Sequence, residues 1–172
     1  MADIMVLNGA ARKNGSTAAL VKAFAEGALK AGNSLREFYL QDMSIRGCLG
    51  CGRCGAGQSG GEDLCVQHDD MAGILRSFMI ADVVVFASPV YFWTVSGPLK
   101  TAADRLYAAL RHLGYEGFRR KSVLLMTAGG SDYSQAIRWY ETFERNLGWT
   151  GLGKVLGAGR TEDARRLGSS IR

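Results

Sequence analysis

The fold is decided near the start of the chain, where residues 5–17 read MVLNGAARKNGST. An apolar run of the kind that forms a buried strand stops at Asn8 and Gly9, and a turn rich in Gly, Asn and Ser then opens into a helical pattern. Backbone N–H groups at the start of a helix have no intrahelical acceptor and lie at the positive end of the helix dipole. The stretch therefore predicts a strand, an anion-binding turn and a helix.

Four residues of this turn are candidates for contacting a phosphate: Arg12 through its charge, and Gly15, Ser16 and Thr17 through their donors. The turn lacks the glycine spacing of a dinucleotide loop and the Gly-Lys-Ser/Thr of a nucleoside-triphosphate loop, which favours a mononucleotide. A purely structural role stays open, because Asn-Gly and Gly-Ser are ordinary turn pairs and a serine at this point caps any helix.

Composition narrows the class of protein. The 172 residues have the length of one domain, 1–172, and a net charge of +5 that is spread along the chain without a basic run interleaved with aromatic residues. We therefore expect anionic small molecules, and no nucleic acid, as partners. The first residues lack the pattern of a signal peptide, and no apolar run is long enough to span a bilayer, so we expect a cytoplasmic protein without a membrane partner.

Strand-like and helix-like segments alternate along the chain, and residues 81–87 form a nearly continuous β-branched run typical of a central strand. The alternation predicts an α/β fold, a three-layer doubly wound parallel sheet of five strands in the flavodoxin-like order 2-1-3-4-5. The expected strands are residues 4–8, 34–40, 81–87, 122–127 and 154–156. The expected helices are residues 17–30, 71–79 with a cap at Asp69 or Asp70, 97–113 and 133–147. The tail, residues 157–172, forms either a short helix or a mobile end.

Three of the expected strands end in unusual loops, and ligands of such sheets bind beyond these carboxyl ends. Besides the first turn, these loops are residues 88–98, where Pro89 is expected to stop the strand before three aromatic residues, and the glycine-containing residues 127–131. Amides of residues 90–94 could reach the polar edge of a planar ligand, and the glycines permit a close approach to a ring. Each loop alone could serve packing or turning, but their common position favours a shared site.

The four cysteines form a second informative pattern. Cys48, Cys51 and Cys54 are each separated by two residues, and ten residues then precede Cys65. Thiolates at this spacing can reach three corners of an iron–sulfur cube, with the distant cysteine as the fourth ligand. Zinc and cysteines without metal remain alternatives, although structural zinc sites usually show two separated Cys-x2-Cys pairs.

Three motifs cover most of the chain in order: Asn8-Gly9 through Ser16-Thr17, Gly47-Cys48 through Asp69-Asp70-Met71, and Ser88-Pro89-Val90-Tyr91 through Gly97-Pro98-Leu99-Lys100 with Asp104-Arg105 after it. Together they resemble the NADPH-dependent FMN reductase family, particularly its iron–sulfur flavoprotein branch. One departure is Ala10-Ala11, where the family commonly has Ser-Pro, so one hydroxyl donor to the phosphate is missing.

The resemblance implies FMN as cofactor and assigns residues to it. The residues implied to hold its phosphate are Arg12, Gly15, Ser16 and Thr17. The residues implied to cradle its ring are Pro89, Val90, Tyr91, Phe92, Trp93, Thr94, Ala128, Gly129 and Gly130. The residues implied to ligate a [4Fe–4S] cluster are Cys48, Cys51, Cys54 and Cys65. From the residues alone, Asp104-Arg105 is expected to set local electrostatics or to form an ion pair.

The function implied is an FMN-dependent NAD(P)H oxidoreductase, which passes a hydride from the nicotinamide to the flavin and then electrons to a quinone, a flavin or another small-molecule or protein acceptor. No catalytic side chain is expected, because the flavin performs the chemistry. Relatives of this kind form homodimers or homotetramers. The alternatives are an iron–sulfur flavoprotein that carries electrons, a flavodoxin-type carrier, and a non-redox regulatory domain on the same fold.

Overall fold

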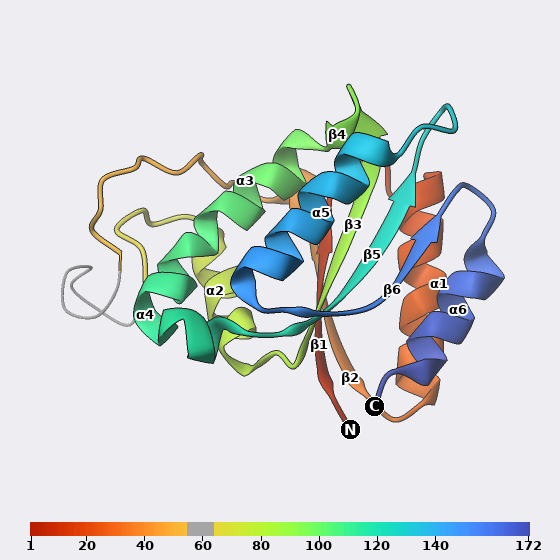
Figure 1. The fold of residues 1–172 in the computed structure, drawn as a ribbon, viewed down its shortest axis with the longest axis horizontal. Coiled ribbons are helices and arrows are strands. Elements are labelled where there is room, and N and C mark those ends of the chain that lie inside the picture. The colour runs from red at the N-terminus through yellow and green to blue at the C-terminus, as the bar shows by residue number, and fades with distance from the viewer. Residues whose placement is uncertain (55–63) are drawn as a thin grey trace.

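A computed structural model describes residues 1–54 and 64–172 of the chain (Figure 1). The strands are β1 (Asp3–Asn8), β2 (Ser34–Tyr39), β3 (Val83–Tyr91), β4 (Thr94–Val95), β5 (Lys121–Thr127) and β6 (Thr150–Leu156). The helices are α1 (Ser16–Lys30), the 3-10 helix η1 (Leu40–Asp42), α2 (Met71–Ile80), α3 (Gly97–Arg105), α4 (Tyr107–Phe118), α5 (Ser134–Leu147) and α6 (Thr161–Ser170).

The strands form a parallel sheet in the order β2-β1-β3-β5-β6, and β4 adds a short antiparallel pairing to the end of β3. Because β4 lies off the main path, the five parallel strands have the order 2-1-3-4-5 when counted along the chain. The predicted α/β fold with its doubly wound sheet is therefore confirmed.

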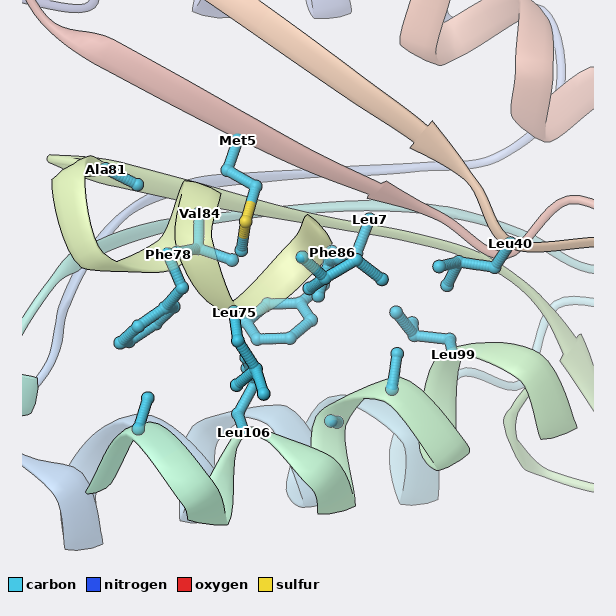
Figure 2. Close-up of a cluster of buried hydrophobic side chains, with 14 of the residues drawn as sticks. Met5, Leu7, Leu40, Leu75, Phe78, Ala81, Val84, Phe86, Leu99 and Leu106 are labelled. Atoms are coloured by element: carbon cyan, nitrogen blue, oxygen red, sulfur yellow. The ribbon is translucent and has the colours of Figure 1, made fainter. Parts of the chain in front are cut away.

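Helices cover both faces of this sheet, with α1 and α6 on one face and α2 to α5 on the other (Figure 1). Alternate residues of a strand point to opposite faces, so Val6 and Val85 pack on the α1 side while Leu7 and Phe86 pack on the other. Figure 2 shows this second core, in which side chains of β1 and β3 meet those of α2 and α3 such as Phe78. The apolar strands are thus buried on both sides, as parallel strands require.

The tail expected either to fold or to stay mobile forms α6 and packs along α1. The two backbones come so close that a Cβ on Gly27 would lie 2.1 Å from the carbonyl oxygen of Arg165, and one on Gly168 would lie 2.1 Å from that of Phe24. Only glycine fits at these two positions, because no real Cβ contact is that short.

Two boundaries differ from the expectations. The prediction that Pro89 stops the third strand was wrong: β3 continues to Tyr91, because its last residues pair with β4 in a hairpin and a proline removes only one N–H donor. The single helix expected over residues 97–113 is divided into α3 and α4 at Leu106, whose N–H contacts the carbonyl oxygens of both Ala102 and Ala103. None of the helices in the described part of the chain is both long and apolar enough to cross a membrane.

Candidate cofactor site

A cavity of ≈ 250 Å³ opens at the carboxyl edge of the sheet, where β1, β3 and β5 end. All three loops singled out in the sequence contribute to its wall. The lining residues are Ala10, Ala11, Arg12, Gly15, Ser16, Thr17, Pro89, Val90, Tyr91, Thr127, Ala128, Gly129 and Ala158. The structure therefore brings together the expected phosphate turn and part of each expected ring-binding loop.

The end of the cavity that is expected to hold a phosphate is formed by the start of α1. Gly15 is the N-cap residue in an extended conformation, and its N–H donates to the carbonyl oxygen of Arg12 at 3.1 Å, which closes the turn. The carbonyl oxygen of Gly15 accepts from the N–H of Ala19 at 3.0 Å. The N–H groups of Ser16 and Thr17 precede this first helical bond, so they are donors at the positive end of the helix.

The side chains of two neighbouring cations, Arg12 and Lys13, lie in different places. Lys13 forms an exposed ion pair with Asp42, and its ammonium lies 5.3 Å from the centre of the Tyr39 ring. The pKa of Lys13 is raised above its ordinary value by the hydrogen bond to Asp42 and by the charge of that carboxylate. Arg12, in contrast, lines the cavity. The charge of Arg12 rather than that of Lys13 is therefore available to an anion in the cavity.

Hydroxyl groups fasten the floor of the cavity. Thr17 Oγ1 and Thr127 Oγ1 are buried and lie 2.6 Å apart in a hydrogen bond that joins the first turn of α1 to the end of β5. On the other side, Ser96 Oγ donates to the carbonyl oxygen of Gly9 at 2.9 Å, and the N–H of Gly9 donates to the carbonyl oxygen of Ala87 at 2.8 Å. The three strand ends are thus tied to one another as well as placed by the sheet.

Four of the expected ring-binding residues lie outside the cavity lining. Phe92 and Trp93 form the turn between β3 and β4, with φ angles of 46° and 63°, and Phe92 is 91% exposed. Two positive φ angles in a two-residue hairpin turn are typical of type I′, which favours Gly and Asn over aromatic residues. Thr94 instead lines a separate surface groove with α5, and Gly130 is exposed at the end of the third loop.

Reasoning from the sequence placed Thr127 in the third loop without giving it a role in the site, and it did not name Ala158; both residues line the cavity. A hydroxyl residue at the carboxyl end of a central strand was a usable signal for Thr127. Ala158 carried no such signal, because its place depends on how the segment after β6 returns towards α1.

The predicted cluster ligands lie between η1 and α2, in a segment that we call the cysteine loop. Its two described parts, residues 43–54 and 64–70, are its stems, and residues 55–63 fall outside the described residues. Cys48 and Cys51 are exposed, Cys54 is half-buried and Cys65 is buried. Burial raises the pKa of the Cys54 thiol, and the charges of the other three cysteines raise it further. Within residues 1–54 and 64–172, no three His, Cys, Asp or Glu residues are arranged to hold a metal ion. The donor set fits a [4Fe–4S] cluster, but its convergence remains a prediction.

A buried ion pair lies beside these cysteines. Arg105 at the end of α3 donates to Asp69 from Nη1 at 2.7 Å and from Nη2 at 3.1 Å. Burial by itself raises the pKa of Asp69, but the hydrogen bonds from Arg105 and from the N–H groups of Arg46 and Met71 outweigh it and hold this pKa below its ordinary value. The neighbouring Asp104 pairs with Lys100 at the surface. Of the two roles expected for Asp104 and Arg105, local electrostatics or an ion pair, the structure shows an ion pair for each of them, with Lys100 and Asp69 respectively.

The fold and the pocket define a flavodoxin-like α/β protein with a cavity at the carboxyl edge of its sheet. The chain belongs to the NADPH-dependent FMN reductase family, whose model matches residues 2–143. The family indicated by the three sequence motifs is thus confirmed, and it is a family of oxidoreductases.

Named relatives agree with this assignment. An iron–sulfur flavoprotein of Archaeoglobus fulgidus is 32% identical over 102 residues, which cover 59% of this chain and 47% of the relative. An FMN-dependent NADH:quinone oxidoreductase of Pseudomonas aeruginosa is 34% identical over 77 residues, covering 40% of this chain and 38% of the relative. The chain spans about half the length or less of these two relatives.

Among solved structures, an NAD(P)H:quinone oxidoreductase from Methanothermobacter marburgensis is similar with a TM-score of 0.72 and 19% sequence identity. The match covers 98% of this chain and 96% of that chain. At this identity the likeness shows a shared fold.

Proposed function

We propose that this chain is an FMN-dependent oxidoreductase that takes electrons from NADH or NADPH and passes them to a quinone, a flavin or another acceptor. The observation that carries the proposal is the cavity itself, because three loops far apart in the sequence meet there around the start of α1. The family and the names of the relatives support the same function.

The residues of the cavity fit the parts of FMN. The N–H groups of Ser16 and Thr17, with the charge of Arg12, would hold the phosphate. The backbone from Pro89 to Tyr91 and the turn at Ala128 and Gly129 would flank the ring, where Gly129 has no atom within 4 Å of the place a Cβ would take. The cavity, at ≈ 250 Å³, is slightly smaller than the usual range of small-molecule pockets, about 300–1,000 Å³, so FMN would extend beyond it.

When bound, FMN supplies the electron-transfer chemistry between a reduced nicotinamide and the acceptor. The chain then needs to bind and orient the cofactor and to leave one face of its ring accessible. No side chain need act as a base. We propose further that residues 1–172 act as one FMN-binding unit in the cytoplasm, where the four cysteines, which are free thiols, stay reduced. The exposed aromatic turn at Phe92 and Trp93 supports a homodimer or homotetramer, because such rings beside a pocket suit a subunit contact.

The test compares two adjacent cations in a titration of the flavin-free protein with FMN, followed by flavin fluorescence. Replacing Arg12 with Ala is expected to weaken FMN binding by about tenfold, since a charge-assisted hydrogen bond to the phosphate is lost. Lys13→Ala is the matched control and is expected to have a much smaller effect, because Lys13 is paired with Asp42. Equal affinities for the wild type and the Arg12 variant would remove Arg12 from the site, and a wild type that binds no FMN would refute the function.

The same cysteines favour a second candidate function, an iron–sulfur flavoprotein that carries electrons. Four free thiols in one segment, one of which contacts a buried guanidinium, form a donor set whose chemistry suits a [4Fe–4S] cluster, and relatives bear the name iron–sulfur flavoprotein. The absorbance spectrum of protein purified without oxygen separates the two. Flavin bands alone support the reductase, whereas flavin bands over a broad brown absorbance support the carrier.

A further inference from the structure

The buried guanidinium of Arg105 is held more elaborately than an ordinary ion pair requires. The side chains of Arg105 and Asp69 are only 2% and 5% exposed. A charge this deeply buried is costly unless it is paired and hydrogen-bonded. Asp69 supplies the pairing, so the remaining contacts of the guanidinium show what else it does.

Those contacts reach both stems of the cysteine loop. Nη1 donates to the carbonyl oxygen of Arg46 at 2.9 Å, two residues before Cys48, and Nη2 lies 3.5 Å from Cys65 Sγ. Asp69 binds the first stem as well, since its Oδ2 accepts from the N–H of Arg46 at 3.0 Å. One ion pair thus fixes the chain before Cys48 and the thiol of Cys65 relative to α3.

The orientation of the guanidinium points to the sulfur. Nη2 is shared between Asp69 and Cys65, while Nε is buried and has no hydrogen-bond partner within the described part of the chain. The contact between Nη2 and Sγ therefore fixes where the sulfur of Cys65 lies relative to α3. Hydrogen bonds of this kind to a ligand commonly orient it and set the properties of a metal centre.

We propose that Arg105 is a positioning residue for a four-thiolate metal site: it fixes Cys65 as the one preformed ligand, around which Cys48, Cys51 and Cys54 close. The proposal rests on the second candidate function, because a [4Fe–4S] cluster is the occupant that this donor set fits. It explains why Cys65 is buried beside a charge whereas Cys48 and Cys51 are exposed. A fixed first ligand lowers the entropy lost when the three exposed or half-buried thiols converge.

The test uses Cd²⁺ as a soft-metal probe on the full chain, reduced and loaded with FMN, with thiolate-to-metal absorbance as the readout. Arg105→Met is expected to weaken Cd²⁺ binding by about tenfold or more, because a charge-assisted hydrogen bond to the ligand sulfur is lost. Lys100→Met is the matched control on the same helix, since it breaks an exposed ion pair, and it is expected to bind Cd²⁺ like the wild type.

A double-mutant cycle with Cys65→Ser separates positioning from a merely structural role. If Arg105 acts through Cys65, Arg105→Met causes no further loss of Cd²⁺ affinity in the Cys65→Ser background, although it still lowers the melting temperature. Arg105→Lys covers the case in which the methionine variant does not fold. It keeps a charge for Asp69 but cannot reach Asp69, Arg46 and Cys65 together, so it is expected to fold and to lose affinity for Cd²⁺.

Three outcomes would overturn the proposal: a wild type that does not bind Cd²⁺, a Cys65→Ser variant that binds it unchanged, or an equal loss from the Arg105 change with and without Cys65. Iron and sulfide reconstitution is measured separately. If the cycle shows coupling but no iron–sulfur absorbance forms, the carrier function fails while the positioning of a thiolate metal site by Arg105 stands.

Discussion

The carboxyl-edge cavity and the cysteine loop are held in place in two different ways. The turns around the cavity begin at strand ends, and hydrogen bonds such as Thr17 to Thr127 join one strand end to the next. The cysteine loop leaves after η1 and returns at α2, and side chains at its stems fasten it, chiefly Asp69 and Arg105. A parallel sheet positions short loops without further devices, whereas a long loop needs a dedicated anchor. The cavity therefore has several supports and the cysteine loop few.

The strongest way to break this contrast is to remove the anchor of the cysteine loop. Asp69→Asn leaves Arg105 buried without a counter-charge, and we expect a loss of about 3–5 kcal/mol in the free energy of unfolding. Urea unfolding followed by circular dichroism measures it. Asp104→Asn is the control, because it breaks an exposed ion pair with Lys100 and should cost less than about 1 kcal/mol. Similar losses in the two variants would show that the buried pair is no special anchor.

The same anchor gives the protein a pH dependence. The pKa of Asp69 is lower in the folded chain than its ordinary value of 3.8, so its contribution is fully present above that value and is lost as the pH falls through the folded pKa. We expect the stability difference between wild type and Asp69→Asn to shrink in urea titrations repeated from pH 6 towards pH 3. The comparison of the two proteins cancels the contributions that the exposed carboxyl groups of Asp132 and Asp163 make to the pH dependence of stability, since their pKa values are also lowered. If the difference in the free energy of unfolding is constant over this range, protonation of Asp69 does not affect the stability of the fold.

The sequence predicted the cavity better than the anchor, for a physical reason. Alternating apolar runs define the strands, and parallel strands bring their carboxyl ends together, so the turns near Ser16, Pro89 and Gly129 could be assigned to one site. The partner of Arg105 could not be predicted, because Asp69 lies 36 residues earlier and no periodicity links the two. The prediction that β3 ends at Pro89 was wrong for a similar reason: it considered only the missing N–H donor of proline, whereas the pairing of Val90 and Tyr91 with β4 extends the strand.

A third variant sharpens the claim that the cavity has several supports. Gly27→Ala would place a Cβ 2.1 Å from the carbonyl oxygen of Arg165, so α6 must shift away from α1, and we expect a loss of about 1–3 kcal/mol in the free energy of unfolding. The FMN affinity of the folded variant should stay close to that of the wild type, because the strand ends hold the start of α1. Gly73→Ala, with its nearest atom at 3.9 Å, is the control and should stabilise α2 by about 0.5–1 kcal/mol. A strong loss of FMN binding in Gly27→Ala would show that α6 is needed to position the turn.

A smaller effect is expected inside the cavity. Thr127→Val removes one hydroxyl group and leaves Thr17 Oγ1 buried without this partner, which should cost about 1–2 kcal/mol in the free energy of unfolding. Because Thr17 lies in the first turn of α1, we also expect FMN to bind severalfold more weakly in a fluorescence titration. Thr142→Val on α5, a half-buried position in the separate surface groove, serves as a control for the same chemical change outside the cavity. Unchanged stability and FMN affinity would show that the hydroxyl pair does not support the floor of the cavity.

The aromatic turn beside the cavity should give the smallest effect and one of opposite sign. Phe92 has a φ of 46° and is 91% exposed, so its side chain gains little from packing while its backbone adopts a conformation that is costly for any residue with a Cβ. Phe92→Gly is expected to raise the free energy of unfolding by about 0.5–1 kcal/mol, whereas Phe92→Ala keeps the Cβ and should change it little. Loss of stability in Phe92→Gly would instead mean that the ring packs usefully against Trp93. NAD(P)H oxidation is then measured for both variants. If Phe92→Gly is more stable and both variants oxidise NAD(P)H equally slowly, the Phe92 ring serves the reaction or a subunit contact. The strained turn then has the role of exposing that ring.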